Sequence, residues 1–390
     1  MTKRHWAHML AVAVLATAAL AAAAPAAAAT PGAVAEDGSA AAAAAAREYL
    51  EARAAAIGAP RPAAVLRARV AAGSALTRTE AQVATGTALR GRHAGRRLTA
   101  VACDVTVLKT RLDLGGMTAR VTAHAVTRLT WRSSGGRTDV EGSGLDHELT
   151  LVRHGDTWRV AADAYTDVLT AAYLEAAGAP RTRVRAAARR SERAAPPVRL
   201  PRAASSLPSR VVDAAAVIPA RGYIDVVKYD RAAAQTYADK YALSYNATYA
   251  RFPGADCANF ASQCAFAGKM LTAPGAYTSG WWYDKHGTSS PSDDTYSMSW
   301  INVTKQMSFW AGRRIDWQPT ISGVGRGDFV YYDWTGDGVW DHVAILVGTN
   351  SSGQKVIDAH TTDHYRVFWK LGSAATKYKF AKVQAQWKIG

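Results

Sequence analysis

The C-terminal half of this chain is built around one predicted helix, in the stretch Asp256-Cys257-Ala258-Asn259-Phe260-Ala261-Ser262-Gln263-Cys264-Ala265-Phe266-Ala267-Gly268. Pro253-Gly254 interrupts the chain just before it, Asp256 is a good N-cap residue, and Gly268 stands where a glycine commonly ends a helix. Apolar side chains recur at steps of three and four residues, which predicts one helix face that packs into a core.

Cys257 falls in the first turn of that predicted helix. Unpaired backbone N–H groups and the positive end of the helix dipole favour a thiolate over a thiol at this position. The alternative is a small buried apolar residue, which is what most free cysteines are. A side chain at the helix N-terminus points away from the apolar face, so we favour a reactive cysteine.

Composition limits the classes of protein that this chain can represent. Its 390 residues suffice for two domains, and alanine runs inflate the hydrophobic fraction of 49%. The net charge of +16 suits an anionic partner such as a cell-wall polymer or a nucleic acid. No zinc-finger pattern, Gly-rich RNA-binding signature or heptad accompanies that charge, so we expect no nucleic-acid partner.

Residues 1–29 have the organisation of a secretory signal peptide. Lys3 and Arg4 form the charged start, an apolar segment follows, and alanines before residue 30 offer A-x-A cleavage sites. The alternative is a membrane anchor, but the apolar run is short and rich in alanine. We therefore expect a secreted monomer, extracellular or associated with the cell wall, with no membrane span after signal removal.

The cysteine count argues against a disulfide-stapled fold. Cys103, Cys257 and Cys264 are the three cysteines, so an exported chain keeps at least one free thiol. A bridge between Cys103 and Cys264 stays open as an alternative. An idle thiol outside the cell would be exposed to oxidation.

Two regions precede the cysteine helix. Residues 30–179 predict a small α+β domain, with an alanine-rich helix from Ser39 to about Ile57 followed by strands that alternate apolar and polar side chains. The order of elements loosely resembles the nuclear-transport-factor-2-like fold. Residues 180–219 carry nine arginines among Ala, Pro and Ser, which predicts a linker that cannot order itself. This linker is either a plain tether, a basic strap onto an anionic wall polymer, or a site of proteolytic release.

Residues 220–390 form the second predicted domain. Helices are expected over residues 230–242 and 300–310, and strands over 328–332, 342–347 and 355–360. The run from Asp333 to Gly338 predicts a hairpin turn. A hairpin turn is favoured over a calcium loop because the run lacks the third acidic position and the closing Glu of an EF-hand.

A cysteine nucleophile needs a base, and the base needs a third group that orients it. His342 begins a predicted strand directly after an acidic turn. If the next loop has an odd number of residues, His342 faces Asp358 or His360, and all three project from one side of the sheet. The alternatives are a His342 that merely bonds Asp341, and a zinc site at His360 and His364. No H-E-x-x-H motif is present, so we expect no metal and no cofactor.

These motifs resemble the putative amidase domain of secreted bacterial proteins. The resemblance covers residues 220–390 and rests, in chain order, on Asp256-Cys257-Ala258-Asn259-Phe260, Gly327-Asp328, Gly336-Asp337-Gly338, Asp341-His342 and Ala359-His360-Thr361. That domain is related to the NlpC/P60 and CHAP cysteine peptidases, which implies an α+β, papain-like core of one helix on an antiparallel sheet. It also implies that Cys257 is the nucleophile and His342 the general base, and it leaves Asp358 and His360 as alternatives for the third group.

Residues near the nucleophile are expected to contact substrate or stabilise an oxyanion. The Cys257 backbone N–H would meet the oxyanion, helped by a hydroxyl of Tyr249 or Tyr245. Asn246, Asp256 and Trp282 complete the set of expected contacts.

The sequence therefore predicts a secreted cysteine amidase or peptidase that hydrolyses an amide bond in cell-wall peptide, with peptidoglycan as the substrate. Two alternatives stay open. One is a wall-binding module of the same fold whose active site has lapsed. The other is an enzyme that transfers the acyl group to an amine instead of water.

Overall fold

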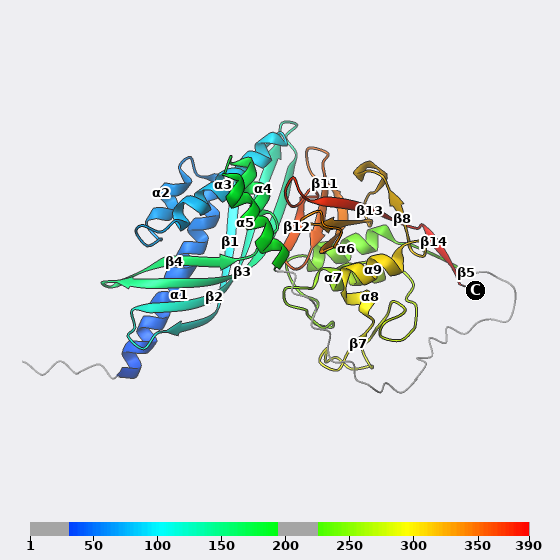
Figure 1. The fold of residues 1–390 in the computed structure, drawn as a ribbon, viewed down its shortest axis with the longest axis horizontal. Helices are drawn as coiled ribbons and strands as arrows, with labels where there is room; N and C mark the ends of the chain where they lie inside the picture. The colour runs from blue at the N-terminus through cyan, green and yellow to red at the C-terminus, as the bar shows by residue number, and fades with distance from the viewer. Residues whose placement is uncertain (1–30, 194–224, 390) are drawn as a thin grey trace, which may run out of the picture.

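The computed structural model describes residues 31–193 and 225–389, which form two units joined through one sheet (Figure 1). The expected signal peptide lies outside the described residues, as does most of the predicted linker. Among the described residues, no helix has the length and apolar character needed to cross a membrane.

The N-terminal unit (residues 31–193) packs helices on one face of an antiparallel meander. Its helices before the sheet are α1 (Pro31–Ala55), η1 (Ala56–Gly58), α2 (Pro62–Arg67) and α3 (Leu76–His93), and its strands are β1 (Arg96–Leu112), β2 (Thr118–Ser133), β3 (Thr138–His154) and β4 (Thr157–Tyr165). One core lies between α1 and the sheet and includes Tyr49, Leu50, Val121, Leu149 and Val160. The predicted alanine-rich helix and alternating strands are confirmed.

The predicted linker begins too early in the sequence. Residues 170–176 form α4 (Thr170–Ala176), and the arginine-rich segment directly after Pro180 forms α5 (Arg181–Arg193). Ala187 of α5 is buried against Val83, Ala171 and Leu174. The expectation that residues 180–193 could not order themselves is therefore wrong, because a small apolar side chain docks this basic helix onto α3 and α4.

The C-terminal unit (residues 225–389) places four helices on one side of an antiparallel sheet (Figure 1). The helices are α6 (Arg231–Tyr241), α7 (Cys257–Ala267), α8 (Met298–Ile301) and α9 (Val303–Trp310), with a short η2 (Ile321–Gly323). The sheet strands are β8 (Ile315–Gln318), β9 (Phe329–Asp333), β10 (His342–Thr349), β11 (Lys355–Ala359), β12 (Asp363–Phe368) and β13 (Lys377–Val383). Two smaller pairs join β5 (Asp225–Lys228) to β14 (Gln386–Ile389) and β6 (Tyr283–Asp284) to β7 (Thr295–Tyr296).

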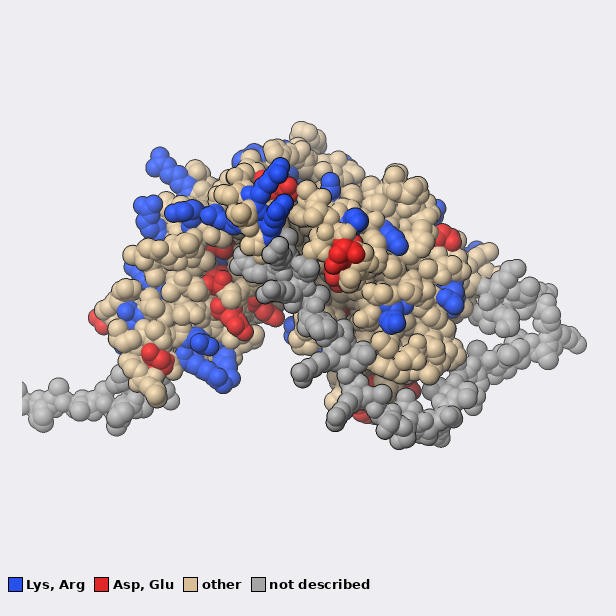
Figure 2. Space-filling model, in the orientation of Figure 1, with Lys and Arg blue, Asp and Glu red and all other residues tan. Residues whose placement is uncertain are grey.

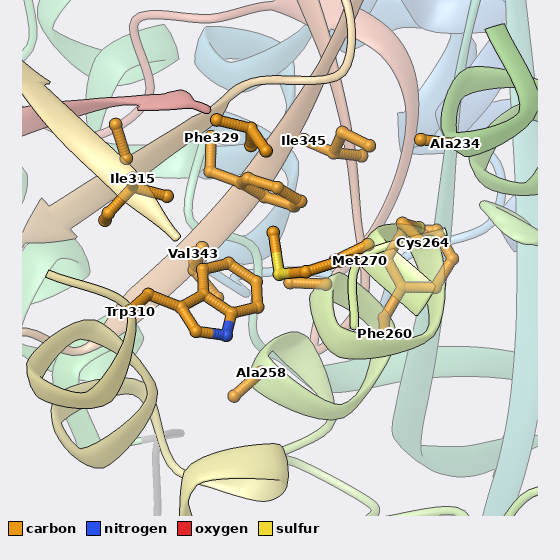
Figure 3. Packing of buried hydrophobic residues seen from close by; sticks show 14 of the residues in the cluster. Ala234, Ala258, Phe260, Cys264, Met270, Trp310, Ile315, Phe329, Val343 and Ile345 are labelled. Atoms are coloured by element: carbon orange, nitrogen blue, oxygen red, sulfur yellow. The ribbon is translucent and has the colours of Figure 1, made fainter. Parts of the chain in front are cut away.

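The central strands of this unit are buried on both faces. Val343 and Ile345 of β10 pack with Phe260 and Cys264 of α7 in one core (Figure 3). Ala344 and Leu346 point the other way and pack in a second core with Leu169, which directly precedes α4 of the N-terminal unit. Double-sided burial explains the continuous apolar run Val343-Ala344-Ile345-Leu346-Val347, in which polar and apolar residues do not alternate.

A single ten-stranded sheet connects the two units. The long strand β3 has two partners along the same edge: residues 147–154 pair with β4, and residues 142–144 pair antiparallel with β12. Gly142 lies opposite Tyr365, where an added Cβ would come within 2.7 Å of the Leu243 side chain and 3.3 Å of Tyr365 Cβ. The glycines of β3 thus allow the close approach that joins the units.

The turn between β9 and β10 is the predicted hairpin connection. The buried Asp333 carboxylate accepts hydrogen bonds from the backbone N–H groups of Gly336 (2.7 Å), Asp337 (3.2 Å) and Gly338 (2.9 Å). The Asp333 carboxylate thus binds the backbone of its own turn, and these hydrogen bonds fix the conformation of the chain that leads into His342.

The fold class α+β is confirmed, since helices pack on a large antiparallel sheet. The papain-like and nuclear-transport-factor-2-like assignments stay predictions. All three cysteines lie in the described residues and are free thiols, so Cys103 and Cys264 do not pair.

Gly142→Val should destabilise the protein, because the new side chain collides with Leu243 and Tyr365 where β3 meets β12. We expect the free energy of unfolding to fall by about 1–3 kcal/mol, the usual cost of overpacking, measured by urea denaturation. Gly115→Val is the matched control, since no heavy atom lies within 4 Å of the added Cβ. Equal stability of the two variants would mean that the strand junction does not contribute to folding.

Candidate active site

Cys257 is the first residue of α7 and is buried, with 4% of its surface exposed. Its backbone N–H donates a hydrogen bond to Thr361 Oγ1 at 3.0 Å, across 104 residues of sequence. A side chain from the end of the sheet therefore satisfies one of the unpaired N–H groups at the helix start. The predicted position of Cys257 in the first helical turn is confirmed.

Asp256 occupies the N-cap position but its carboxylate does not cap the helix. Oδ1 accepts hydrogen bonds from the Phe252 backbone N–H (2.9 Å) and Asn259 Nδ2 (3.0 Å), and Oδ2 lies 2.7 Å from His360 Nδ1. Asp256 therefore stands at the predicted N-cap position, but the expectation that its side chain caps α7 is wrong. The carboxylate instead fixes the loop before the helix and binds the histidine of the next motif.

His360 forms a buried ion pair with Asp256. Its second nitrogen, Nε2, lies 2.8 Å from the Tyr241 carbonyl oxygen. A carboxylate and a carbonyl only accept hydrogen bonds, so both ring nitrogens must donate and the ring is an imidazolium. Burial by itself lowers the pKa of His360, but the hydrogen bond that the ring donates to Asp256, together with the charges of Asp363 and Asp256, outweighs burial and raises the pKa. Phe260 stacks on the ring, with centroids 3.9 Å apart.

Thr361 is held in an unusual backbone conformation beside the thiol. Its φ of 86° lies in the left-handed region, which a β-branched residue rarely adopts and which costs free energy. The Thr361 hydroxyl also interacts with the Cys257 thiol. Burial raises the pKa of Cys257 to about 11, although the Thr361 hydroxyl and the Val343 backbone act in the opposite direction. The thiol is thus protonated at neutral pH in this geometry.

His342 does not meet Cys257. It pairs with Tyr332 across β9 and β10, and its ring stacks on Trp334 with centroids 5.4 Å apart. Tyr332 and Trp334 belong to the core on the face opposite α7. Burial and the nearby His364 lower the pKa of His342 to about 3, and its Nε2 is buried without a hydrogen-bond partner.

A β-bulge explains why the predicted register fails. Thr349 pairs with Lys355, so the loop between β10 and β11 has an odd number of residues as the prediction required. The pairing then shifts by one residue between Leu346 and Gly348, and Ile345 faces Asp358. A shift of one residue exchanges the faces of a strand. The expectation that His342, Asp358 and His360 share one side of the sheet is therefore wrong.

Asp358 lies on the α7 side but orients neither histidine. Its Oδ1 accepts a hydrogen bond from the Arg366 backbone N–H at 2.7 Å. Burial, together with the charge of Asp239, raises the pKa of Asp358 well above its usual range. The prediction that Asp358 orients His342 is therefore not met, and the carboxylate beside His360 is that of Asp256.

The other predicted contact residues form their hydrogen bonds and ring contacts with groups other than the thiol. Tyr249 packs edge-on against Tyr283, and Asn246 Nδ2 donates to Tyr237 OH at 2.9 Å. The Trp282 backbone N–H donates to Ser297 Oγ at 3.1 Å. Tyr245, a suggested oxyanion donor, donates its hydroxyl to Asp363 Oδ1 at 3.0 Å.

Two residues of the sequence motifs form contacts between α7 and the sheet that the sequence did not predict. Thr361 stands in the quoted run Ala359-His360-Thr361, and Asp256 directly precedes the nucleophile, but neither was expected to bridge α7 and the sheet. Adjacency of a polar residue to each motif was the available signal. Within the described residues, no group of three or more His, Cys, Asp or Glu side chains could hold a metal ion.

Comparisons with known proteins locate one family in this chain. Residues 228–383 match the model of the family described as "Putative amidase domain". Two curated proteins of Bacillus subtilis (strain 168) are similar. "Uncharacterized protein YhbB" is 31% identical over 149 residues, covering 36% of this chain and 44% of that protein. "Uncharacterized protein YjcM" is 30% identical over 151 residues, covering 36% of this chain and 32% of that protein. The alignments thus span less than half the length of either relative.

Among solved structures, the intermembrane space region of the chloroplast protein ARC6 aligns with 31% of this chain and 90% of its own chain. Its TM-score of 0.24 and sequence identity of 11% are too low to support an argument about the fold. The family match covers the region that contains Cys257, His342 and His360, and residues 228–383 are similar to the putative amidase domain.

Proposed function

We propose that the C-terminal unit is a secreted cysteine hydrolase that cleaves an amide bond in cell-wall peptide through a thioester on Cys257. The observation that carries this proposal is the position of Cys257 at the start of α7, directly beside the buried Asp256–His360 pair. Similarity to the putative amidase domain supports an amide substrate. The signal-like pattern of residues 1–29 and the net charge of +16 support a location at an anionic cell wall.

His360 serves as the proton carrier in this proposal. It lies on the same side of the sheet as α7, its imidazole is oriented by Asp256, and its neighbour Thr361 bonds Cys257 directly. His342 packs in the core on the other face of the sheet. A nucleophile, a proton carrier and an orienting carboxylate are the three parts that thiol catalysis requires, with Asp256 as the positioning residue.

The proposed reaction conserves atoms and protons. Neutral His360 takes the proton of the Cys257 thiol, and the thiolate attacks the amide carbonyl carbon. The C–N bond breaks, the amine leaves with the proton from His360, and a thioester remains. Water then attacks the thioester while His360 takes one of its protons. The C–S bond breaks, the acid product leaves, and the proton returns to the thiolate.

The described geometry holds one proton more than this cycle requires, because His360 is an imidazolium while Cys257 is a thiol. Activity therefore requires that His360 lose a proton and exchange its hydrogen bond with the Tyr241 carbonyl for one with the thiol. The Cys257 N–H would stabilise the oxyanion once the substrate carbonyl replaces Thr361 Oγ1 as its acceptor.

Substitutions should separate the two histidines. Cys257→Ala and His360→Asn should abolish release of new amino groups from purified cell wall, whereas His342→Asn should keep activity within about threefold, given correct folding by thermal melting. The reason is that only His360 shares a face with the thiol. Equal release by Cys257→Ala and wild type would end the proposal. Loss with His342→Asn but not with His360→Asn would overturn the choice of proton carrier.

Activity should rise with pH through the titration of His360. Because the pKa of His360 is raised, the acidic limb of kcat/KM should have its midpoint above 6.5, the ordinary value for histidine. Asp256→Asn removes the carboxylate that raises this pKa, so the limb should move to lower pH while kcat falls. An acidic limb at the same pH in both proteins would show that another group titrates.

The second candidate function is a wall-binding module of the same fold that has lost catalytic activity. The buried thiol favours it, since the pKa of Cys257 is about 11 in this geometry. Alkylation by iodoacetamide separates the two candidates. In a hydrolase, labelling of Cys257 should rise along the same acidic limb as activity. In a lapsed module, labelling should stay negligible until the pH approaches 11. Cys103 must first be replaced by Ser, because it is only partly buried and would also react.

A further inference from the structure

A basic groove lies on the N-terminal unit, between α2, the segment that follows it, α3 and the β3–β4 hairpin. Its volume is about 1010 Å³. Four arginines line it: Arg61 and Arg67 at the two ends of α2, Arg78 of α3 and Arg159 of β4. Figure 2 shows basic side chains gathered over the end of the molecule that carries α2 and α3. We call this feature the basic groove.

The positive charge of the basic groove is not neutralised. No Asp or Glu is among its lining residues, and within the described residues its four arginines form no ion pair. Other arginines of the same unit do pair: Arg53 with Glu80, Arg96 with Asp139 and Arg128 with Asp104. Four unpaired guanidinium groups around one hollow create a strong local positive potential and favour a ligand with several negative charges.

The walls of the basic groove are fixed by hydrogen bonds. Val160 N–H of β4 donates to the Arg69 carbonyl, and Ala71 N–H donates to the Val160 carbonyl, both at 2.9 Å. Ser74 Oγ donates to the Ala161 carbonyl at 3.1 Å. On α3, the lining residues at positions 77, 78, 81, 82 and 85 share one helix face. A preformed wall lowers the entropy cost of binding.

The lining chemistry selects the class of anion. Guanidinium groups bind phosphate in a bidentate manner, and the Thr77 hydroxyl adds a neutral polar group for a hydroxylated backbone. No Phe, Tyr or Trp is among the lining residues, and His154 supplies the one aromatic ring, so the groove lacks the row of rings on which successive nucleic-acid bases stack. We propose that the basic groove binds a linear phosphodiester polymer with a polyol backbone, of the poly(glycerol phosphate) type. This proposal does not rest on the activity of Cys257.

The parent protein for the test is residues 30–390 with the substitution Cys257→Ala. The measured quantity is its dissociation constant for poly(glycerol phosphate). The groove variant replaces Arg61, Arg67, Arg78 and Arg159 by Gln. We expect this variant to bind the polymer at least tenfold more weakly. The slope of log Kd against log salt concentration should also decrease by roughly 3, because each of the four lost phosphate contacts removes about 0.7 from the slope. The control variant removes the same charge outside the basic groove by replacing Arg97, Lys109, Arg111 and Arg120 by Gln, and it should bind like the parent. Thermal melting confirms that both variants fold.

Two outcomes would overturn the proposal. Equal weakening in both variants would mean that net charge, and not the basic groove, binds the polymer. If a single-stranded oligonucleotide of equal charge binds as tightly, and only the groove variant loses it, the partner is a nucleic acid instead.

Discussion

The buried Asp256–His360 ion pair holds the candidate site together. It ties the residue before α7 to the end of β11, so helix and sheet meet in one fixed geometry. Burying two charges is unfavourable unless their hydrogen bonds are satisfied, and here the carboxylate has three partners and the imidazolium two. Loss of one partner from such a pair typically costs about 3–5 kcal/mol. The Cys257 sulfur depends on this pair for its position, because Thr361 follows His360 directly and bonds the Cys257 N–H.

The strained backbone at Thr361 follows from the same constraint. His360 must turn toward Asp256 while the next side chain reaches the start of α7, and a φ of 86° achieves both. Strain of this kind persists only where surrounding contacts hold it, and it is common at functional sites. The structure therefore places a strained residue, a buried cation and a thiol within one short contact network, which is the physical basis for the hydrolase proposal.

The two units depend on each other through the sheet. Residues that precede α4 pack against the face of β9–β11 opposite α7, and β3 extends the sheet through β12. This cover buries His342 among Tyr332 and Trp334, which explains why its pKa is depressed and why it carries no charge at neutral pH. The N-terminal unit is thus part of the packing of the C-terminal unit, and it also carries the basic groove.

The sequence by itself determined the helix at Cys257, the strands, the Asp333 turn and the family, because each depends on local signals: caps, periodicity, turn residues and short motifs. It could not determine which side chains meet. The bulge between Leu346 and Gly348 and the Thr361 contact with Cys257 depend on packing between segments far apart in the chain. Side chains alternate faces along a strand, so one inserted residue moves His342 to the opposite face from Asp358. Only the tertiary structure decides that register, and with it which of the two histidines lies on the α7 side of the sheet.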